Sequence, residues 1–240
     1  MDAIKVSNLT KQFKNVLAVN NISFNVKEGE IFGVLGLNGA GKTTTIKMMS
    51  GLTRPTSGNI KVFDYDIYKD INKIKSIIGI SPQESAIANN LTVKENIELM
   101  ASLYFKDKIK IKDNIELVIN NLGLENYINR RAKTLSGGYK RRLSIAMALV
   151  TNPRILFLDE PTLGLDVINR HELWNVISNL KGKVTIILTS HYMEEISVLV
   201  DDIAIMQNGK ILMIDKLENI LKFTNTNALE EAFIKIVGEN

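Results

Sequence analysis

Cysteine is absent from the 240 residues, and long apolar runs are absent as well, although apolar residues make up 45% of the chain. Without cysteine, the chain has no disulfide framework, no thiolate zinc site and no cysteine nucleophile, and a reducing compartment fits. No run approaches the roughly 18 apolar residues of a membrane-spanning helix. The first residues also lack the basic segment and apolar core of an export signal. We therefore expect a cytoplasmic chain that neither spans a membrane nor is exported.

Charge of one sign is not in strong excess. Lysine and arginine total 30 against 26 acidic residues, for a formal net charge of +4. Such a mild bias is typical of lysines spread over a solvated surface rather than of a nucleic-acid-binding footprint. We therefore expect no nucleic acid partner. The apolar content is sufficient for a large core in one domain or a two-lobed one.

The first part of the sequence has the pattern of strands. Apolar and polar residues alternate in places over residues 1–30, most clearly at Ile22, Phe24 and Val26, which predicts short antiparallel strands. Residues 31–35 are almost continuously apolar, as in a buried central strand. A glycine-rich turn follows this strand, and we expect a helix to begin near Lys42.

Residues 84–150 have helical patterns instead. Thr92 and Glu95 have the spacing of a capping box, and apolar residues recur behind them at helical intervals. A second helical pattern ends at Gly123, which suits a C-cap. The sequence therefore predicts an inserted helical lobe.

The pattern returns to alternating strands and helices from about residue 154. Strands are predicted at residues 155–158 and 184–188, with a helix over 166–180 between them. This alternation implies a largely parallel sheet. Asn208-Gly209 indicates a two-residue hairpin between two further strands, and a short helix closes the chain.

The glycine-rich turn, GLNGAGKT at residues 36–43, matches the G-x-x-x-x-G-K-[ST] phosphate loop and has the required strand before it and helix after it. Glycines let backbone N–H groups converge on phosphate oxygens, and the helix N-terminus adds the positive end of its dipole. Lys42 can reach the β and γ phosphates, and Thr43 offers a hydroxyl to Mg²⁺. An ordinary glycine turn is the disfavoured alternative.

Asp159 and Glu160 stand at the carboxyl end of a buried strand, where ligands of open α/β sheets bind. Alone, an apolar run followed by two acids is a weak signal. Together with the phosphate loop, it indicates that Asp159 holds hydrated Mg²⁺ and that Glu160 accepts a proton from an attacking water. His191 ends another predicted strand and is a candidate for contacting the γ-phosphate or positioning water, whereas His171 is expected to be solvated.

A second glycine loop, LSGGYKRR, occupies residues 135–142. Ser136 is a good N-cap for the helix that follows, which makes this loop a second anion site. It lacks the loop lysine, and no acidic strand end follows closely. It would therefore fail as a complete catalytic site but would work as half of one, which suggests that two chains share their sites. The basic Lys140, Arg141 and Arg142 are expected to be solvated or at a dimer edge rather than in contact with lipid.

Together these motifs resemble the nucleotide-binding subunit of an ATP-binding cassette (ABC) transporter over nearly the whole chain. Their order and spacing agree with the family: the Walker A loop at 36–43, the Q-loop at Gln83, the signature at 135–138, the Walker B strand at 155–160, the D-loop at 163–166 and the switch histidine at His191. Tyr139 departs from the glutamine most often found at its place.

The resemblance implies ATP and Mg²⁺ as cofactors. The catalytic residues that the resemblance implies are Glu160, His191 and Lys42. The metal ligands that it implies are Thr43, Gln83 and Asp159. The residues that it assigns to ATP are Phe13, Asn38, Gly39, Ala40, Gly41, Lys42, Thr43, Thr44, Gln83, Ser136, Gly137, Gly138 and His191. Phe13 is implied to stack on adenine, although the sequence alone favours a local packing role.

The resemblance also implies an α/β fold of the P-loop NTPase type, with a mostly parallel central sheet, an antiparallel β subdomain and an inserted helical subdomain. The expected divisions are a catalytic core at 1–83 and 151–215, a helical subdomain at 84–150 and a helical tail at 216–240. Two subunits, identical or related, pair head to tail so that Ser136 of one caps the γ-phosphate held by Lys42 of the other.

A separate integral membrane permease is the implied partner, which would hold the subunit at the inner face of the cell membrane. SGGYKRRL, SHYMEE and NALEEAFIKIVG resemble the branch that exports drugs, peptides and polysaccharides. One alternative is a soluble cassette ATPase of DNA repair or translation, but such proteins usually carry tandem cassettes or long insertions. A regulatory module without turnover is disfavoured by the intact Lys42, Asp159, Glu160 and His191.

Overall fold

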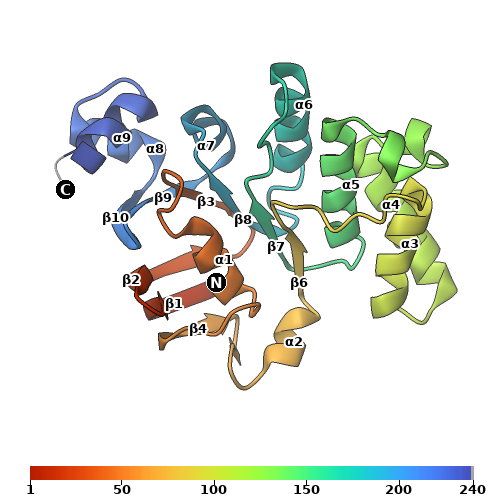
Figure 1. Ribbon diagram of the computed structural model, residues 1–240, viewed down its shortest axis with the longest axis horizontal. Helices are drawn as coiled ribbons and strands as arrows, with labels where there is room; N and C mark the ends of the chain where they lie inside the picture. Colours follow the sequence, from red (N-terminus) through yellow and green to blue (C-terminus); the bar gives the residue numbers. More distant parts are fainter. Residues whose placement is uncertain (239–240) are drawn as a thin grey trace. The chain divides into compact units, whose positions relative to one another are not determined.

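The computed structural model describes residues 1–238, and the chain forms two compact units. The first unit combines residues 1–75 with the chain from residue 181 onward, and the second comprises residues 76–180. In Figure 1 the first unit has the red, orange and blue elements, and the second has the yellow, green and teal ones. Within residues 1–238, no helix has both the length and the apolar character needed to cross a membrane.

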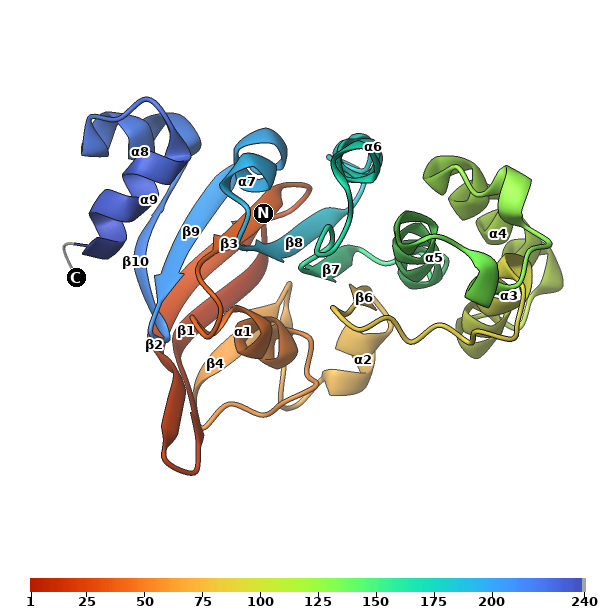
Figure 2. The same ribbon diagram turned by 45° about the horizontal axis from the view of Figure 1, so that its top comes forward.

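An antiparallel sheet forms part of the first unit. Its strands follow the order β2-β1-β4-β5 and span Asp2–Phe13 (β1), Val16–Lys27 (β2), Ser57–Val62 (β4) and Tyr65–Asp66 (β5). The alternating Ile22, Phe24 and Val26 are all buried, which confirms the predicted antiparallel strands. The prediction of short strands was wrong, because β1 and β2 have 12 residues each and form the long hairpin seen in Figure 2.

The second sheet of this unit carries the parallel strands. β3 (Ile31–Leu35) pairs in parallel with β8 (Thr185–Ser190) and with β9 (Asp202–Gln207). Every residue of β3 and β8 is buried, as expected for strands covered on both faces. β10 (Lys210–Asp215) adds antiparallel to β9 through the predicted Asn208-Gly209 turn, in which both residues have positive φ. The helices of the unit are α1 (Lys42–Met49), α2 (Ile71–Lys75), α7 (Met193–Leu199), α8 (Leu217–Thr224) and α9 (Leu229–Gly238).

The second unit contains the predicted helices. α3 (Val93–Tyr104), α4 (Lys108–Leu122) and α5 (Gly137–Leu149) pack together, and Figure 1 shows them in green shades. The Thr92–Glu95 capping box and the left-handed Gly123 C-cap are confirmed. Two short parallel strands, β6 (Ile78–Ser81) and β7 (Ile155–Asp159), complete the unit with α6 (Val167–Ser178) and two 3₁₀ turns at Glu125–Tyr127 and Ala132–Thr134.

The strand β6 and the short helices α2, α7 and α8 were not predicted individually. β6 has only four residues and includes Gly79 and Ser81, so its apolar run is too brief to recognise. The structure gives Gly79 a packing reason, because a Cβ there would lie 2.6 Å from the carbonyl oxygen of Ala148. α2, α7 and α8 are five to eight residues long, which leaves little periodicity to detect.

Candidate nucleotide site

The phosphate loop joins β3 to α1 in the first unit. α1 begins at Lys42, as predicted, behind the left-handed Gly41 with φ of 109°. Cβ atoms built on Gly36 and Gly41 would lie 2.4 and 2.5 Å from the carbonyl oxygens of Met206 and Ala18. Only glycine therefore fits at these two positions. The buried Lys42 ammonium donates to the carbonyl oxygens of Gly36 at 2.7 Å and Leu37 at 3.3 Å, and so spans the loop.

The middle of this loop is open. Asn38 and Gly39 are exposed, and a Cβ on Gly39 would meet no atom within 4 Å. Ala40 is buried, and its carbonyl accepts from the backbone N–H of Gly209, which anchors the loop from behind. Thr43 and Thr44 lie half-buried on the first turn of α1. The loop thus has anchored ends, a helix N-terminus and an accessible backbone in its middle, and these are the requirements for phosphate binding.

The structure brings His191 beside the phosphate loop. Leu35 of β3 is in register with Ser190 of β8, and the backbone N–H of Gly36 donates to the Ser190 carbonyl at 3.3 Å. His191 is the next residue, half-buried, with its ring centroid 4.1 Å from that of Tyr192. The structure therefore brings the predicted His191 to the edge of the phosphate loop.

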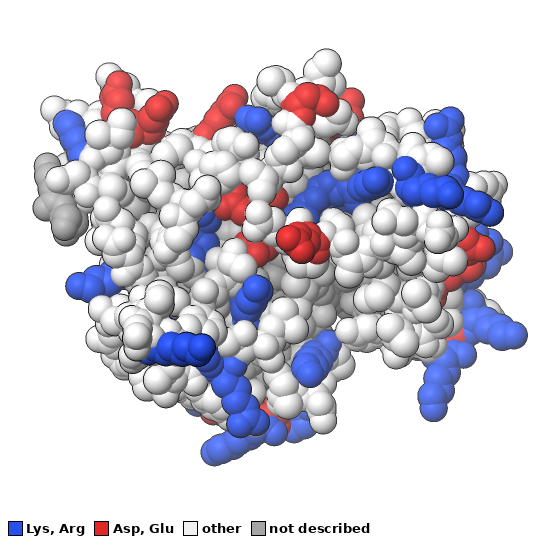
Figure 3. Space-filling view, viewed as in Figure 1, with Lys and Arg blue, Asp and Glu red and all other residues white. Residues whose placement is uncertain are grey.

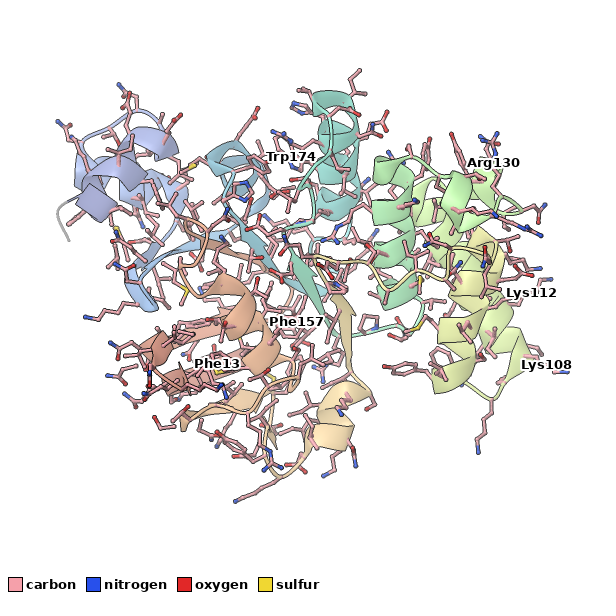
Figure 4. All side chains as sticks on the ribbon, in the orientation of Figure 1. Phe13, Lys108, Lys112, Arg130, Phe157 and Trp174 are labelled. Atoms are coloured by element: carbon pink, nitrogen blue, oxygen red, sulfur yellow. The ribbon has the colours of Figure 1, made fainter. Side chains whose placement is uncertain are left out.

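Phe13 ends β1 at the tip of the antiparallel hairpin, where Figure 4 labels it. Its side chain is 46% exposed, and the Lys11 ammonium lies 4.7 Å from the ring centroid. An exposed ring can stack on a planar base, and the lysine adds positive charge beside it.

In the second unit, β6 and β7 bring Gln83 and the acidic pair to the same edge. Ser81 is in register with Leu158, so the chain beyond each strand emerges side by side. Gln83 is exposed, whereas Asp159 and Glu160 are only 4% and 6% exposed. Glu160 also has a left-handed backbone with φ of 48°. A non-glycine residue in this region is strained and is frequently found at functional sites.

The signature loop begins α5 as predicted, with the Ser136 Oγ accepting from the backbone N–H of Tyr139 at 3.5 Å. Gly138 is pressed against Asn169 of α6, because an added Cβ would lie 2.4 Å from its Oδ1. Asp166 caps α6 and accepts from both the backbone and the side chain of Asn169. The structure therefore brings the signature together with the segment 163–166.

The structure contradicts the prediction that the basic residues after the signature are all solvated. Arg141 and Arg142 are only 6% and 9% exposed, so the prediction that they are solvated was wrong. A guanidinium can replace its hydration by donating to several acceptors at once, and both side chains do so. The helical spacing could have indicated the burial of Arg141, because Arg141 lies four residues before the buried Ile145 and therefore on the same helix face. His171 is exposed as expected, with its ring edge against Trp174.

Sequence comparison shows what kind of protein carries these sites. The family model described as ABC transporter matches residues 19–163. The linearmycin resistance ATP-binding protein LnrL of Bacillus subtilis (strain 168) is 41% identical over 212 residues, which cover 88% of this chain and 68% of that protein. The chain belongs to the ABC transporter family. It is an ABC ATPase domain, and the sequence resemblance is thereby confirmed.

Other relatives of this cassette differ in length. The daunorubicin/doxorubicin resistance ATP-binding protein DrrA of Streptomyces peucetius is 36% identical over 88% of this chain and 64% of that protein. The human phospholipid-transporting ATPase ABCA3 is 40% identical over 87% of this chain, which spans only 12% of its length. A solved ATP-binding cassette described as a dimeric post-hydrolysis state bound to ADP and Pi superposes with a TM-score of 0.81 at 26% identity, over 89% of this chain and 98% of that one.

The oxygen donors of this ABC cassette suit Mg²⁺. Thr43 in the first unit offers a hydroxyl and Asp159 in the second unit offers a carboxylate, and each is a hard oxygen ligand of the kind that Mg²⁺ prefers. The part of the chain that the structure describes has no cluster of three or more His, Asp or Glu side chains able to cage an ion alone.

Proposed function

We propose that this cassette is the ATP-binding subunit of an ABC exporter, which hydrolyses ATP at a head-to-tail dimer interface and drives a separate membrane permease. One observation carries the dimeric part of the proposal: the signature loop begins a helix, as the phosphate loop does, but has no lysine at the loop-lysine position. Its nearby guanidinium groups hydrogen-bond to other segments, because Arg141 donates to the Asp159 and Pro161 carbonyls and Arg142 donates to the Glu172 carboxylate. The loop is therefore suited to complete a site on another chain.

Each side chain has a separate task in the proposed reaction. Loop amides and Lys42 hold the phosphates and neutralise charge as it develops. Glu160 accepts the proton of the attacking water, and His191 fixes that water or the γ-phosphate. Thr43, Gln83 and Asp159 would hold Mg²⁺, which, when bound, supplies further charge neutralisation. The remaining loop residues, Asn38, Gly39, Ala40, Gly41 and Thr44, enclose the phosphates.

Across the dimer, Ser136, Gly137 and Gly138 of one subunit would contact the γ-phosphate held by the other. The solved dimeric cassette bound to ADP and Pi, described above, supports this arrangement. In the proposed cycle, ATP joins the two subunits and its hydrolysis releases them. The permease would follow this closing and opening between its inward and outward states.

The names of the relatives favour export. LnrL and DrrA are named as linearmycin and daunorubicin/doxorubicin resistance ATP-binding proteins, and the matches cover 68% and 64% of them, which supports a drug-like cargo and a permease on another polypeptide. ABCA3 is a phospholipid-transporting protein of much greater length. None of these three is a protein of DNA repair or translation, so we retain transport as the proposed role and a peripheral location at the inner membrane face.

α3 offers a surface for the permease. Leu99, Leu103 and Tyr104 are 49%, 71% and 43% exposed, which is unusual for apolar side chains gathered at one helix end. Basic side chains surround the α3–α4 region, and Figure 3 shows Lys and Arg gathered toward the right of the view. In Figure 4 the labelled Lys108, Lys112 and Arg130 point outward there, whereas Phe157 lies inside.

Replacement of Glu160 tests the proposed reaction. Glu160→Gln removes the base but keeps its size, so we expect kcat to fall at least a hundredfold and ATP with Mg²⁺ to trap a dimer detectable by size-exclusion chromatography. Glu125→Gln, an exposed acid in the same unit, is the control and is expected to leave turnover unchanged. Full-speed hydrolysis by Glu160→Gln would refute the assigned base. Copurification from native membranes with no integral membrane protein would refute the transport role.

A further inference from the structure

Arg141 connects two strand ends of the second unit. Its guanidinium donates to three backbone carbonyls: from Nη2 to Asp159 at 2.7 Å, from Nε to Pro161 at 2.8 Å and from Nη1 to Pro82 at 2.5 Å. The side chain is 6% exposed, so these bonds form in an environment where they are stronger than in water. One side chain of the signature helix therefore holds the chain beyond both β6 and β7.

Two of these carbonyls flank Glu160. Asp159 precedes it and Pro161 follows it, and Glu160 between them has the left-handed φ of 48°. Such a conformation is disfavoured for a residue with a side chain, and a residue before proline normally adopts extended backbone. A strained conformation persists only when its surroundings hold it. The two bonds from Arg141 hold the backbone on either side of the strained residue.

The third carbonyl precedes Gln83. Pro82 lies between the end of β6 and Gln83, and Arg141 binds its oxygen from the same guanidinium plane. Because a guanidinium is rigid and planar, a shift of the Pro82 carbonyl changes the geometry of the other two bonds. The same side chain therefore contacts the backbone just before Gln83 and the backbone on both sides of Glu160.

We propose that Arg141 is a positioning residue for ATP hydrolysis, which holds Glu160 in its reactive backbone conformation and links it to Gln83. The inference rests on the proposed roles of Glu160 as the base and of Gln83 as a ligand of the nucleotide site. The three acceptors described above are backbone carbonyls, so the proposed role of Arg141 is to hold the backbone around the base. Its predicted effect is therefore on turnover more than on ATP affinity.

Arg142 provides a matched control one residue away. It is similarly buried at 9% exposure, but it donates to the Leu122 carbonyl at 3.2 Å and to the Glu172 carboxylate. Its hydrogen-bond partners belong to α4 and α6, and its guanidinium also lies 5.3 Å from the ring centroid of Tyr139; none of these residues belongs to either strand end. Loss of Arg142 tests the contacts that α5 makes with α4, α6 and Tyr139, whereas loss of Arg141 removes the hydrogen bonds to the backbone on both sides of Glu160.

The experiment compares Arg141→Lys with Arg142→Lys in the full chain, by steady-state ATPase kinetics, fluorescent-ATP binding and urea unfolding. Lysine keeps the charge but cannot donate in three fixed directions. For Arg141→Lys we expect kcat to fall at least tenfold, with KM and ATP affinity within threefold of the parent chain. For Arg142→Lys we expect kcat within threefold. Arg141→Ala, assayed with millimolar methylguanidinium, is expected to regain at least threefold in kcat, and Arg142→Ala is not.

Two results would overturn the inference: parental kcat in Arg141→Lys, or a loss of kcat matched by Arg142→Lys and explained by lower stability. Should Arg141→Ala fail to fold, the lysine variant still decides the question. The Glu160→Gln experiment is separate. If that variant traps a dimer while Arg141→Lys turns over normally, only the role of Arg141 is refuted; if Glu160→Gln hydrolyses ATP at full rate, the proposed function itself is refuted.

Discussion

Tyr127 and Tyr139 stack with their ring centroids 3.9 Å apart and their planes tilted by 30°. The guanidinium groups of Arg130 and Arg142 lie 4.9 and 5.3 Å from the two ring centroids, so the aromatic pair is flanked by cations. Hydrogen bonding to the Tyr127 side chain raises the pKa of Tyr139. The residue that departs from the family's usual glutamine is thus part of a packed cluster behind the signature loop.

Replacement of Tyr139 by glutamine is expected to leave ATPase activity within about tenfold, or about 1.4 kcal/mol of barrier, because backbone amides and Ser136 supply the main phosphate donors. The lost stacking is expected to lower the free energy of unfolding by about 0.5–1.5 kcal/mol. Tyr139→Phe keeps the stack and is the control for stability. Steady-state kinetics and urea unfolding measure the two effects, and a complete loss of activity in a folded Tyr139→Gln protein would contradict this account.

Gly138→Ala is expected to destabilise the fold because the new Cβ would lie 2.4 Å from the Asn169 Oδ1. Overpacking of this kind costs about 1–3 kcal/mol. At Gly137 a Cβ would meet only a Leu165 methyl at 3.8 Å, so Gly137→Ala is the matched control and is expected to be neutral for stability. Urea unfolding compares the two. If both alanine variants were equally stable, the Asn169 side chain would have moved aside with no loss in the free energy of unfolding, which would contradict the prediction.

The charge of Asp166 is expected to stabilise the cassette at neutral pH. The backbone N–H of Asn169 is the main cause that holds the pKa of Asp166 below its ordinary value of 3.8. A group whose pKa is lower in the folded state stabilises it above the unfolded pKa and loses that effect as the pH falls through the folded pKa. Asp166→Asn keeps a capping side chain without the charge. We expect this variant to be less stable at pH 7, with the difference shrinking below pH 3.8. A difference independent of pH would rule out the charge as its cause.

The sequence predicted the phosphate loop, the buried strands around it and the capped helices α3 and α4, because each has a local signal. A glycine spacing, a continuous apolar run or the Thr92–Glu95 pair can be read without knowledge of the fold. The site assignments rest on the same motifs. The structure adds that Ser190 and Gly36 bring His191 to the loop, and that β6 and β7 bring Gln83 to the acidic pair.

Tertiary partners could not be predicted in the same way. Three consecutive basic residues are typical of a solvated surface, and only the fold shows that Arg141 finds carbonyls from residues 59 positions before it and 18 and 20 positions after it. The left-handed backbone of Glu160 also has no sequence signal, because glycine or asparagine would normally mark such a position. Burial of a charge is decided by contacts that are distant in the sequence.

The Phe13 side chain is expected to contribute to the affinity of the cassette for ATP. Its ring is 46% exposed beside the Lys11 ammonium, so it can stack on an adenine at small structural cost. We expect Phe13→Ala to weaken ATP binding by about tenfold, in line with about 0.5–1.5 kcal/mol for an aromatic pair, whereas Phe13→Trp retains affinity. Leu17→Ala is the control, because Leu17 lies on the same hairpin and is 44% exposed. Titration with a fluorescent ATP analogue measures all three variants. If Phe13→Ala binds as tightly as Leu17→Ala, Phe13 has only the packing role that its sequence first suggested.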